Sequence, residues 1–182
     1  MKTACYRGVP MLGFAAYSGV GKTTTLKNLL PVLLKRNIRV AVVKHTHHRF
    51  EIDLPGKDSY QLRAAGAKQI VVGNAKLRAS IFETRNDREP DLVSFLSEVD
   101  TTAVEAILIE GFRHGLFPKI EVNRDVDDVL LAETDENVVA IFSDDPSHSA
   151  LIAKHLPLDD VGAHADFVEE YLQLARSNLN PK

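Results

Sequence analysis

Residues 16–23 combine the glycines and side chains that bind phosphate in nucleotide-binding proteins. The segment follows an apolar stretch, precedes an amphipathic one and ends in Gly-Lys-Thr. Gly19 and Gly21 allow backbone conformations in which several amide N–H groups point at one anion. The ammonium group of Lys22 can neutralise the β and γ phosphates, and the hydroxyl of Thr23 can ligate Mg²⁺. The spacing therefore predicts a phosphate-binding loop between a strand and a helix.

One position departs from the strict motif, which begins with glycine where this chain has Ala16. Alanine is the smallest replacement, and the positive end of the following helix dipole favours an anion at the same place. These features favour nucleotide binding over a chance glycine-rich turn. The residues predicted to bind the nucleotide phosphates are Ser18, Gly19, Val20, Gly21, Lys22, Thr23 and Thr24.

Two carboxylates are candidates for holding Mg²⁺ and orienting a water molecule. Glu110 ends the apolar stretch 104–110, and the carboxyl ends of buried parallel strands face the ligand site of open α/β sheets. Asp53 begins an Asp-Leu-Pro-Gly segment, which matches the Asp-x-x-Gly pattern of many GTPases. The alternatives are a solvated glutamate at a strand end and a loop that only leads into a capped helix. The sequence predicts Lys22, Asp53 and Glu110 as catalytic residues, and Thr23, Asp53 and Glu110 as metal ligands.

Residues 44–48 read Lys-His-Thr-His-His, directly after a predicted strand at 39–43. Three histidines in four residues suggest a metal site, but no cysteine lies nearby and no helical i, i+4 pair completes a set of zinc ligands. The pattern therefore argues against a dedicated zinc site. Lys44 and His45 can instead face the phosphates or an anionic group of a partner, and the roles of His47 and His48 stay open.

Short apolar runs alternate with helical patterns along most of the chain. The runs predicted as strands lie at residues 11–15, 39–43, 69–72, 79–83, 104–110, 119–123 and 138–142. Apolar residues recur with helical spacing from Leu26, from Leu92 and from Val168. This alternation predicts an α/β fold, a three-layer sandwich around a mainly parallel sheet. We expect one domain at residues 1–176, with a β-hairpin extension at about 72–84, and a flexible tail at 177–182.

Composition and charge exclude several classes of protein. The 182 residues carry 22 basic and 25 acidic side chains, for a formal net charge of −3, and 45% of them are hydrophobic. This balance argues against wholesale disorder, a nucleic-acid coat and a polybasic membrane binder. The single cysteine, Cys5, cannot form an internal disulfide, which fits a reducing compartment. We therefore expect a cytoplasmic protein that binds neither nucleic acid nor membrane.

Five sequence blocks together resemble the MobB family, the molybdopterin-guanine dinucleotide biosynthesis adaptor proteins. They are the phosphate-binding loop within 14–24, Val-Lys-His-Thr-His-His at 43–48, Asp-Leu-Pro-Gly-Lys-Asp-Ser-Tyr at 53–60, Leu-Arg-Ala-Ala-Gly-Ala at 62–67 and Ile-Glu-Gly-Phe-Arg-His at 109–114. The phosphate-binding loop is common to many families. The His-Thr-His-His and Pro-Gly-Lys-Asp-Ser blocks, in this order, are much more specific.

The resemblance implies a P-loop NTPase fold, with GTP and Mg²⁺ as ligands and weak GTPase activity. It also implies an accessory role beside MobA, the guanylyltransferase that joins GMP to molybdopterin during molybdenum cofactor biosynthesis. Members of the family are homodimers that exchange β-hairpin segments, and the hairpin predicted at 72–84 suits that use. A MobA-like guanylyltransferase is the implied protein partner, and molybdopterin is a further candidate ligand.

The sequence lacks the Asn-Lys-x-Asp motif with which many GTPases recognise guanine. Asn123 begins an Asn-Arg-Asp segment, and Asp144 lies in a Ser-Asp-Asp-Pro segment after the last strand predicted above. We predict that Asn123 and Asp144 contact the guanine base, against the alternative that Asp144 lies in an ordinary turn. The alternative function is that of a small-metabolite kinase, in which residues 85–88, Arg-Asn-Asp-Arg, would form a lid; the polar composition of this segment favours a solvated turn instead. Rapid phosphate transfer to an acceptor would indicate the kinase, and slow hydrolysis the adaptor.

Overall fold

The computed structural model describes residues 1–16, 21–46, 52–84, 90–124, 129–151 and 154–179. These residues form two compact units. The first comprises Met1–His45 and Asp91–Lys182, and the second comprises Thr46–Pro90.

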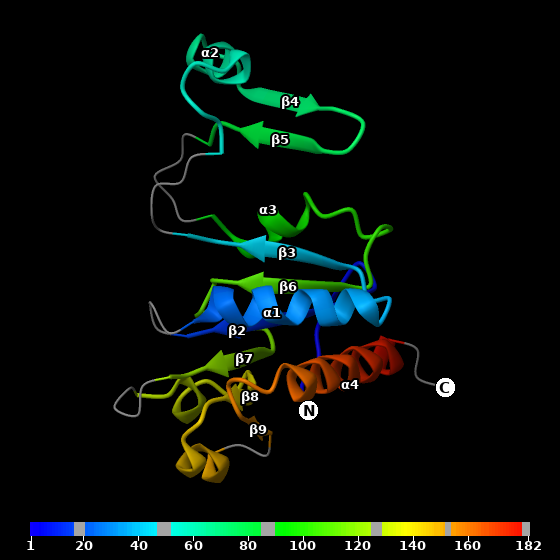
Figure 1. Cartoon of the computed structure of the whole chain (residues 1–182), viewed down its shortest axis with the longest axis vertical. Coiled ribbons are helices and arrows are strands. Elements are labelled where there is room, and N and C mark those ends of the chain that lie inside the picture. The colour runs from blue at the N-terminus through cyan, green and yellow to red at the C-terminus, as the bar shows by residue number, and fades with distance from the viewer. Residues whose placement is uncertain (17–20, 47–51, 85–89, 125–128, 152–153, 180–182) are drawn as a thin grey trace. The chain divides into compact units, whose positions relative to one another are not determined.

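The first unit is built on a seven-stranded sheet with the order β3-β6-β2-β7-β8-β9, and β1 pairs with β2. The strands are β1 Cys5–Tyr6, β2 Val9–Ala15, β3 Val40–Lys44, β6 Ala106–Glu110, β7 Lys119–Val122, β8 Val138–Phe142 and β9 His155–Leu156. All pairings are parallel except that of β1 with β2. The carboxyl ends of β3, β6, β2 and β7 consequently meet at one edge, at the left in Figure 1.

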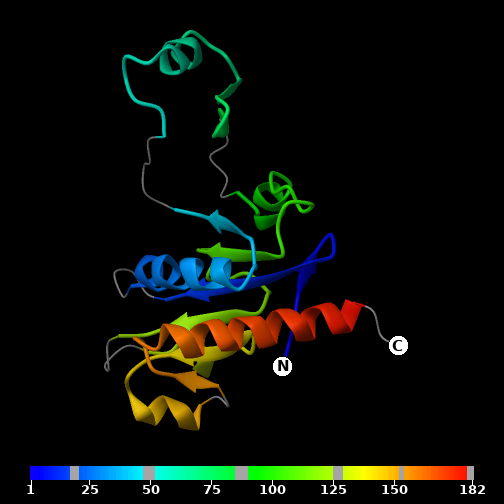
Figure 2. The same cartoon turned by 45° about the vertical axis from the view of Figure 1, so that its right-hand side comes forward.

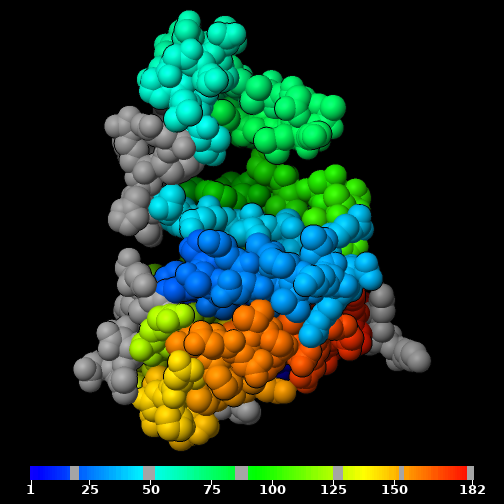
Figure 3. Space-filling model, viewed as in Figure 1, coloured from blue at the N-terminus to red at the C-terminus, as the bar shows by residue number. Residues whose placement is uncertain are grey.

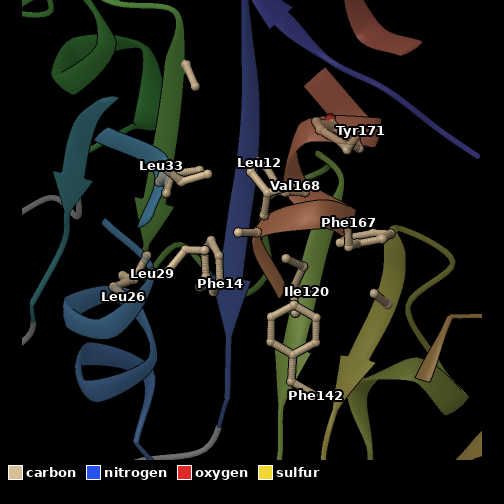
Figure 4. Close-up of a cluster of buried hydrophobic side chains, with 14 of the residues drawn as sticks. Leu12, Phe14, Leu26, Leu29, Leu33, Ile120, Phe142, Phe167, Val168 and Tyr171 are labelled. Atoms are coloured by element: carbon tan, nitrogen blue, oxygen red, sulfur yellow. The ribbon is translucent and has the colours of Figure 1, made fainter. Parts of the chain in front are cut away.

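Two long helices, α1 (Lys22–Lys35) and α4 (Val161–Leu179), lie side by side over one face of this sheet (Figures 1 and 2). They form an unbroken layer of side chains in the space-filling view (Figure 3). Leu29 and Leu33 of α1, and Val168 and Tyr171 of α4, turn toward Phe14 and its neighbours in the sheet (Figure 4). Their helical spacing buries one stripe of each helix, which is why the sequence pattern located both helices correctly.

Shorter elements cover the opposite face of the sheet. The five-residue helix α3 (Leu92–Leu96) packs over Val43, Ile107 and Ile109, and the 3₁₀ helix η1 (Leu131–Glu133) packs over Ile141. A second 3₁₀ helix, η2 (Pro146–Ala150), follows β8. The first unit therefore has helices on both faces of a mainly parallel sheet, as the sequence predicted.

The second unit contains helix α2 (Asp58–Ala64) and an antiparallel pair of strands, β4 (Gln69–Gly73) and β5 (Arg78–Phe82). The hairpin predicted from the two neighbouring apolar runs is therefore confirmed. Its turn is closed by Asn74, whose side-chain oxygen accepts hydrogen bonds from the backbone N–H groups of Lys76 and Leu77. This is the local bond by which asparagine favours a turn.

Some elements differ from the sequence prediction. Strands β1 and β9 have two residues each, too few to produce a hydrophobic pattern, and both were missed. Helix α4 continues to Leu179, so its last turn occupies the first residues of the segment predicted as a flexible tail.

None of the helices in the described part of the chain is both long and apolar enough to cross a membrane.

Tyr171 joins α4 to the first two strands. Its hydroxyl donates a hydrogen bond to the backbone oxygen of Met11 (2.8 Å) and accepts one from the backbone N–H of Ala4 (3.1 Å). The side chain is fully buried, and burial raises the pKa of the hydroxyl to about 12. The group therefore stays protonated and acts as donor and acceptor together at physiological pH.

We predict that Tyr171→Phe lowers the free energy of unfolding by about 1–3 kcal/mol, because it leaves two partly buried backbone groups without this partner. Urea denaturation of the variant and of Tyr6→Phe measures the effect. The ring of Tyr6 is only partly buried, so its variant should unfold within about 0.5 kcal/mol of wild type. Equal stability of all three proteins would contradict this role for the Tyr171 hydroxyl.

Candidate functional site

Helix α1 begins directly after Gly21, the second glycine of the phosphate-binding motif. Gly21 is the N-cap of α1 and has φ of 100°, a left-handed conformation that glycine adopts without strain. A Cβ atom at this position would lie 2.9 Å from Nε of Arg124. The backbone conformation therefore favours glycine here, and a Cβ atom would in addition displace the flexible end of the Arg124 side chain.

Lys22, the first residue of α1, folds back toward the end of β2. Its Nζ donates a hydrogen bond to the backbone oxygen of Ala16 (2.9 Å). Burial lowers the pKa of Lys22 below its ordinary value, Arg113 and Lys44 lower it further, and Glu110 opposes them. Several cations thus gather around one carboxylate, and an anionic ligand would relieve their mutual repulsion.

Thr23, Lys44 and Glu110 come together at the edge where β3 and β6 end. Lys44 and Glu110 are opposite residues in the register of these two strands. Oε1 of Glu110 accepts hydrogen bonds from the Thr23 hydroxyl and from Lys44 Nζ, each at 2.8 Å. Lys44 Nζ also donates to Thr23 Oγ1 at 3.3 Å. The predicted pair of metal ligands, Thr23 and Glu110, is therefore assembled from segments 87 residues apart.

The oxygen atoms of this pair suit Mg²⁺, which binds carboxylate and hydroxyl oxygens together with substrate phosphates. Glu110 is buried, with 8% of its surface exposed, and Thr23 is exposed beside it. A buried carboxylate that meets an exposed hydroxyl provides a fixed negative charge at an open position. The donor set therefore fits a magnesium ion.

The chain turns sharply after Glu110 in a way that fixes this carboxylate. Gly111 and Phe112 both have positive φ, 101° and 50°. The ring of Phe112 stacks on the ring of His45, with centroids 4.7 Å apart, and the backbone N–H of His45 donates to the backbone oxygen of Glu110 (2.9 Å). A non-glycine residue at positive φ is uncommon and often marks a functional site. Here it turns the chain away directly after the strand-end carboxylate.

Asn123 and Asp144 lie in one pocket beside the start of α1. This pocket of about 360 Å³ is lined by Asn123, Arg124, Asp144, Asp145 and Pro146. Asn123 is buried, and the position of Asp144 is fixed because its Oδ1 accepts the backbone N–H of Leu158 at 2.9 Å. The structure therefore brings the two predicted base-contacting residues together, and Arg124 links their pocket to Gly21.

Asp53 lies in the second unit, where it has local partners. Its Oδ1 accepts a hydrogen bond from the Ser59 hydroxyl (2.7 Å), and its Oδ2 lies 3.6 Å from Nε of Arg63. Arg63 also donates to Glu83 at the end of the hairpin (2.6 Å). These contacts tie the Asp53 loop to α2 and β5. Its participation in metal binding stays a prediction.

Several predicted site residues fall outside the described part of the chain. These are Ser18, Gly19 and Val20 of the phosphate-binding loop, His47 and His48, and the predicted lid at 85–88. Among the described residues, no group of three or more His, Cys, Asp and Glu side chains could hold a metal ion. Thr24, the remaining predicted phosphate contact, lies exposed in the first turn of α1.

Comparison with solved structures supports the same fold. A crystal structure of molybdopterin-guanine biosynthesis protein B covers 90% of this chain and 99% of its own, with a TM-score of 0.67 and 23% sequence identity. The crystal structure of Bacillus subtilis MobB covers 89% and 97%, with a TM-score of 0.67 and 24% identity. At these identities the likeness shows the α/β architecture.

The sequence model of the family described as molybdopterin guanine dinucleotide synthesis protein B, MobB, matches residues 11–144. The chain belongs to the MobB family. It is 43% identical over 170 residues to the molybdopterin-guanine dinucleotide biosynthesis adapter protein of Escherichia coli K12, spanning 91% of this chain and 94% of that protein. It is 36% identical over 164 residues to the adapter protein of the same name from Haemophilus influenzae, spanning 90% of each.

Sequence reasoning did not assign Arg113 and Arg124 to the site of this MobB-family chain. Arg113 acts on the pKa of Lys22, and Arg124 packs against the start of α1. Arg113 comes three residues after Glu110, and Arg124 comes directly after Asn123; the sequence had already indicated Glu110 and Asn123 as strand-end residues. The signal was therefore present, because residues just after parallel strands share the ligand-binding edge of the sheet.

We predict that Gly111→Ala destabilises the protein more than Gly8→Ala. Both glycines have positive φ, but a Cβ on Gly8 meets no atom within 4 Å, whereas one on Gly111 would lie 2.9 Å from the backbone oxygen of His45. Gly8→Ala should cost about 1–2 kcal/mol of unfolding free energy from backbone strain alone. Gly111→Ala should cost at least about 1 kcal/mol more, because His45 must move. Equal losses in denaturant titrations would show that the His45 contact is unimportant.

Proposed function

We propose that this chain is a GTP-binding adapter protein of molybdopterin-guanine dinucleotide biosynthesis, with weak GTPase activity. Family membership and the adapter proteins that match nearly the whole chain support the role in this biosynthesis. The observation that carries the nucleotide part is that Lys44 contacts Glu110 at the start of α1 and that Lys22, which begins this helix, lies close enough to both for their charges to act on its pKa. A triphosphate supplies the negative charge that such a cluster is suited to bind.

Each part of the site has a separate task in this proposal. Lys22 and the amide groups at the start of α1 bind the β and γ phosphates. Thr23 and Glu110 would hold Mg²⁺, which neutralises charge on the phosphates when bound. The pocket that contains Asn123 and Asp144 receives the guanine base, whose ring N–H and amino group can donate to a carboxylate. Its volume is in the range of small-ligand pockets.

Slow hydrolysis is consistent with the hydrogen bonds around Glu110. The oxygen that faces Thr23 already accepts two hydrogen bonds, one of them from the cation of Lys44. A water molecule can be activated at that oxygen only after one of these bonds is released. This arrangement favours binding over rapid turnover, which suits a protein whose output is a complex with a guanylyltransferase of the MobA type. Molybdopterin is a further candidate ligand of that complex.

We predict that Lys22→Ala weakens GTP binding at least about 30-fold, because it removes the cation that the phosphate-binding motif assigns to the β and γ phosphates. Lys35→Ala is the matched control, since Lys35 lies exposed in the last turn of the same helix. Calorimetric titration with GTP and with ATP, in the presence of Mg²⁺, measures both variants and wild type. Wild type should prefer GTP, Lys35→Ala should match it, and both variants should keep the wild-type circular dichroism. Unchanged affinity in Lys22→Ala would refute the assignment.

A homodimer joined through the hairpin belongs to the same proposal. A two-stranded sheet is marginally stable by itself in water. The described hairpin leaves Val71 and Leu77 62% and 70% exposed, and Val72 and Phe82 are also exposed. A second copy of the chain would cover these side chains.

We predict that Val71→Asp raises the dimer dissociation constant at least about tenfold, because a charge would be buried against an apolar surface. Val93→Asp is the control, since Val93 is equally exposed, at 63%, but lies on α3. Sedimentation equilibrium of both variants and wild type measures the effect. The hairpin is not the interface if the two variants dissociate alike or if wild type is monomeric.

A further inference from the structure

Lys44 is a second cation beside Thr23 and Glu110, the predicted pair of metal ligands. Oxygen Oε1 of Glu110 has two lone pairs, and the hydrogen bonds from Thr23 and Lys44 use both. Lys44 Nζ lies within hydrogen-bond distance of both oxygens predicted to bind magnesium, at 2.8 and 3.3 Å. The ammonium group therefore makes contacts that a divalent ion at the same pair would need.

The ammonium group and a divalent cation cannot both bind Oε1 closely. Coordination of Mg²⁺ by this oxygen requires a lone pair that Lys44 now uses. Two like charges about 3 Å apart also repel strongly at the edge of a protein interior. Binding of a metal ion through Oε1, the oxygen that faces Thr23, therefore requires that Lys44 release this oxygen.

The side chain of Lys44 is placed to make this movement. Its backbone is fixed in β3, opposite Glu110 in the sheet register. Its side chain is 49% exposed, compared with 10% for Glu110, so only the lysine end of the ion pair has room to move. A lysine carries its charge on a four-carbon stem with several rotatable bonds. Lys22 and its phosphate-binding helix begin directly beside this pair.

We propose that Lys44 is a positioning residue that competes with Mg²⁺ for Glu110 and moves to the γ-phosphate when the metal ion binds. The inference rests on the proposed GTP binding. Without metal, Lys44 supplies positive charge beside the phosphates and supports metal-independent binding. With metal, the carboxylate is taken by the divalent ion and the freed ammonium group contacts the phosphate. Lys44 thereby makes nucleotide affinity less dependent on Mg²⁺.

Lys44→Met tests this competition through binding alone. The affinity for a non-hydrolysable GTP analogue is measured by calorimetry in Mg²⁺ and in EDTA. The variant should bind the analogue about tenfold more weakly in EDTA, an effect of the order of one charge-assisted hydrogen bond. Its loss in Mg²⁺ should be smaller, so the ratio of the two dissociation constants rises. Lys44→Gln, which keeps a hydrogen-bond donor without the charge, should show the same rise. Lys35→Met is the matched control.

Binding of Mn²⁺ without nucleotide gives a second readout. Electron paramagnetic resonance should show tighter Mn²⁺ binding to Lys44→Met than to wild type, because the competing ammonium group is gone. The inference is overturned if Mn²⁺ affinity is unchanged and the analogue is weakened equally in both buffers, since Lys44 would then be an ordinary phosphate contact. It is also overturned if the variant behaves like Lys35→Met. If wild type binds no GTP analogue at all, the proposed function fails, and the Mn²⁺ comparison still decides whether Lys44 competes at Glu110.

Discussion

The buried carboxylate of Glu110 is the interaction on which the arrangement of the site depends. Its side chain accepts hydrogen bonds from the Thr23 hydroxyl of α1 and from Lys44 of β3. Its backbone oxygen accepts a hydrogen bond from the backbone N–H of His45. A buried negative charge is stable only when it is paired and hydrogen-bonded. The requirement is met here by Thr23 and Lys44, which lie on two other segments of the chain. Consequently the ends of β3 and β6 and the start of α1 are held in one place.

The surrounding fold supplies the geometry for this pairing. Parallel pairing brings Lys44 opposite Glu110 and Phe14 opposite Glu110 on its other side, so three strands end together. The core formed by α1, α4 and the sheet fixes the axis of α1, and with it the positions of Lys22 and Thr23. On the other face, Phe95 packs edge-to-face against Phe112 and supports the turn after Glu110. The apolar packing on both faces of the sheet thus positions the polar residues of the site.

The sequence predicted the parts whose signal is local and repeated. The leucine stripe of α1 and the apolar run ending at Glu110 located elements correctly because burial imposes a period on the chain. The partners of each site residue were harder to predict, because they depend on strand order. Neither the sharing of one Glu110 oxygen by Thr23 and Lys44 nor the approach of Arg124 to Gly21 can be derived from spacing. The short motif at Asp53 gave no sign of the hydrogen bond that Asp53 accepts from Ser59 or of its ion pair with Arg63.

The ion pair between Lys44 and Glu110 at the carboxyl ends of β3 and β6 distinguishes this site from one built for rapid phosphoryl transfer. Rapid phosphoryl transfer needs a metal ion and a water molecule held without competition at the transition state. Here a lysine of the protein contacts the same carboxylate oxygen that would hold the metal ion. Under the proposed function, the site would bind a triphosphate, and each turnover would require that this ion pair rearrange. The proposed function would then favour long occupancy by nucleotide over rapid hydrolysis, because the ion pair between Lys44 and Glu110 has to be broken before each turnover.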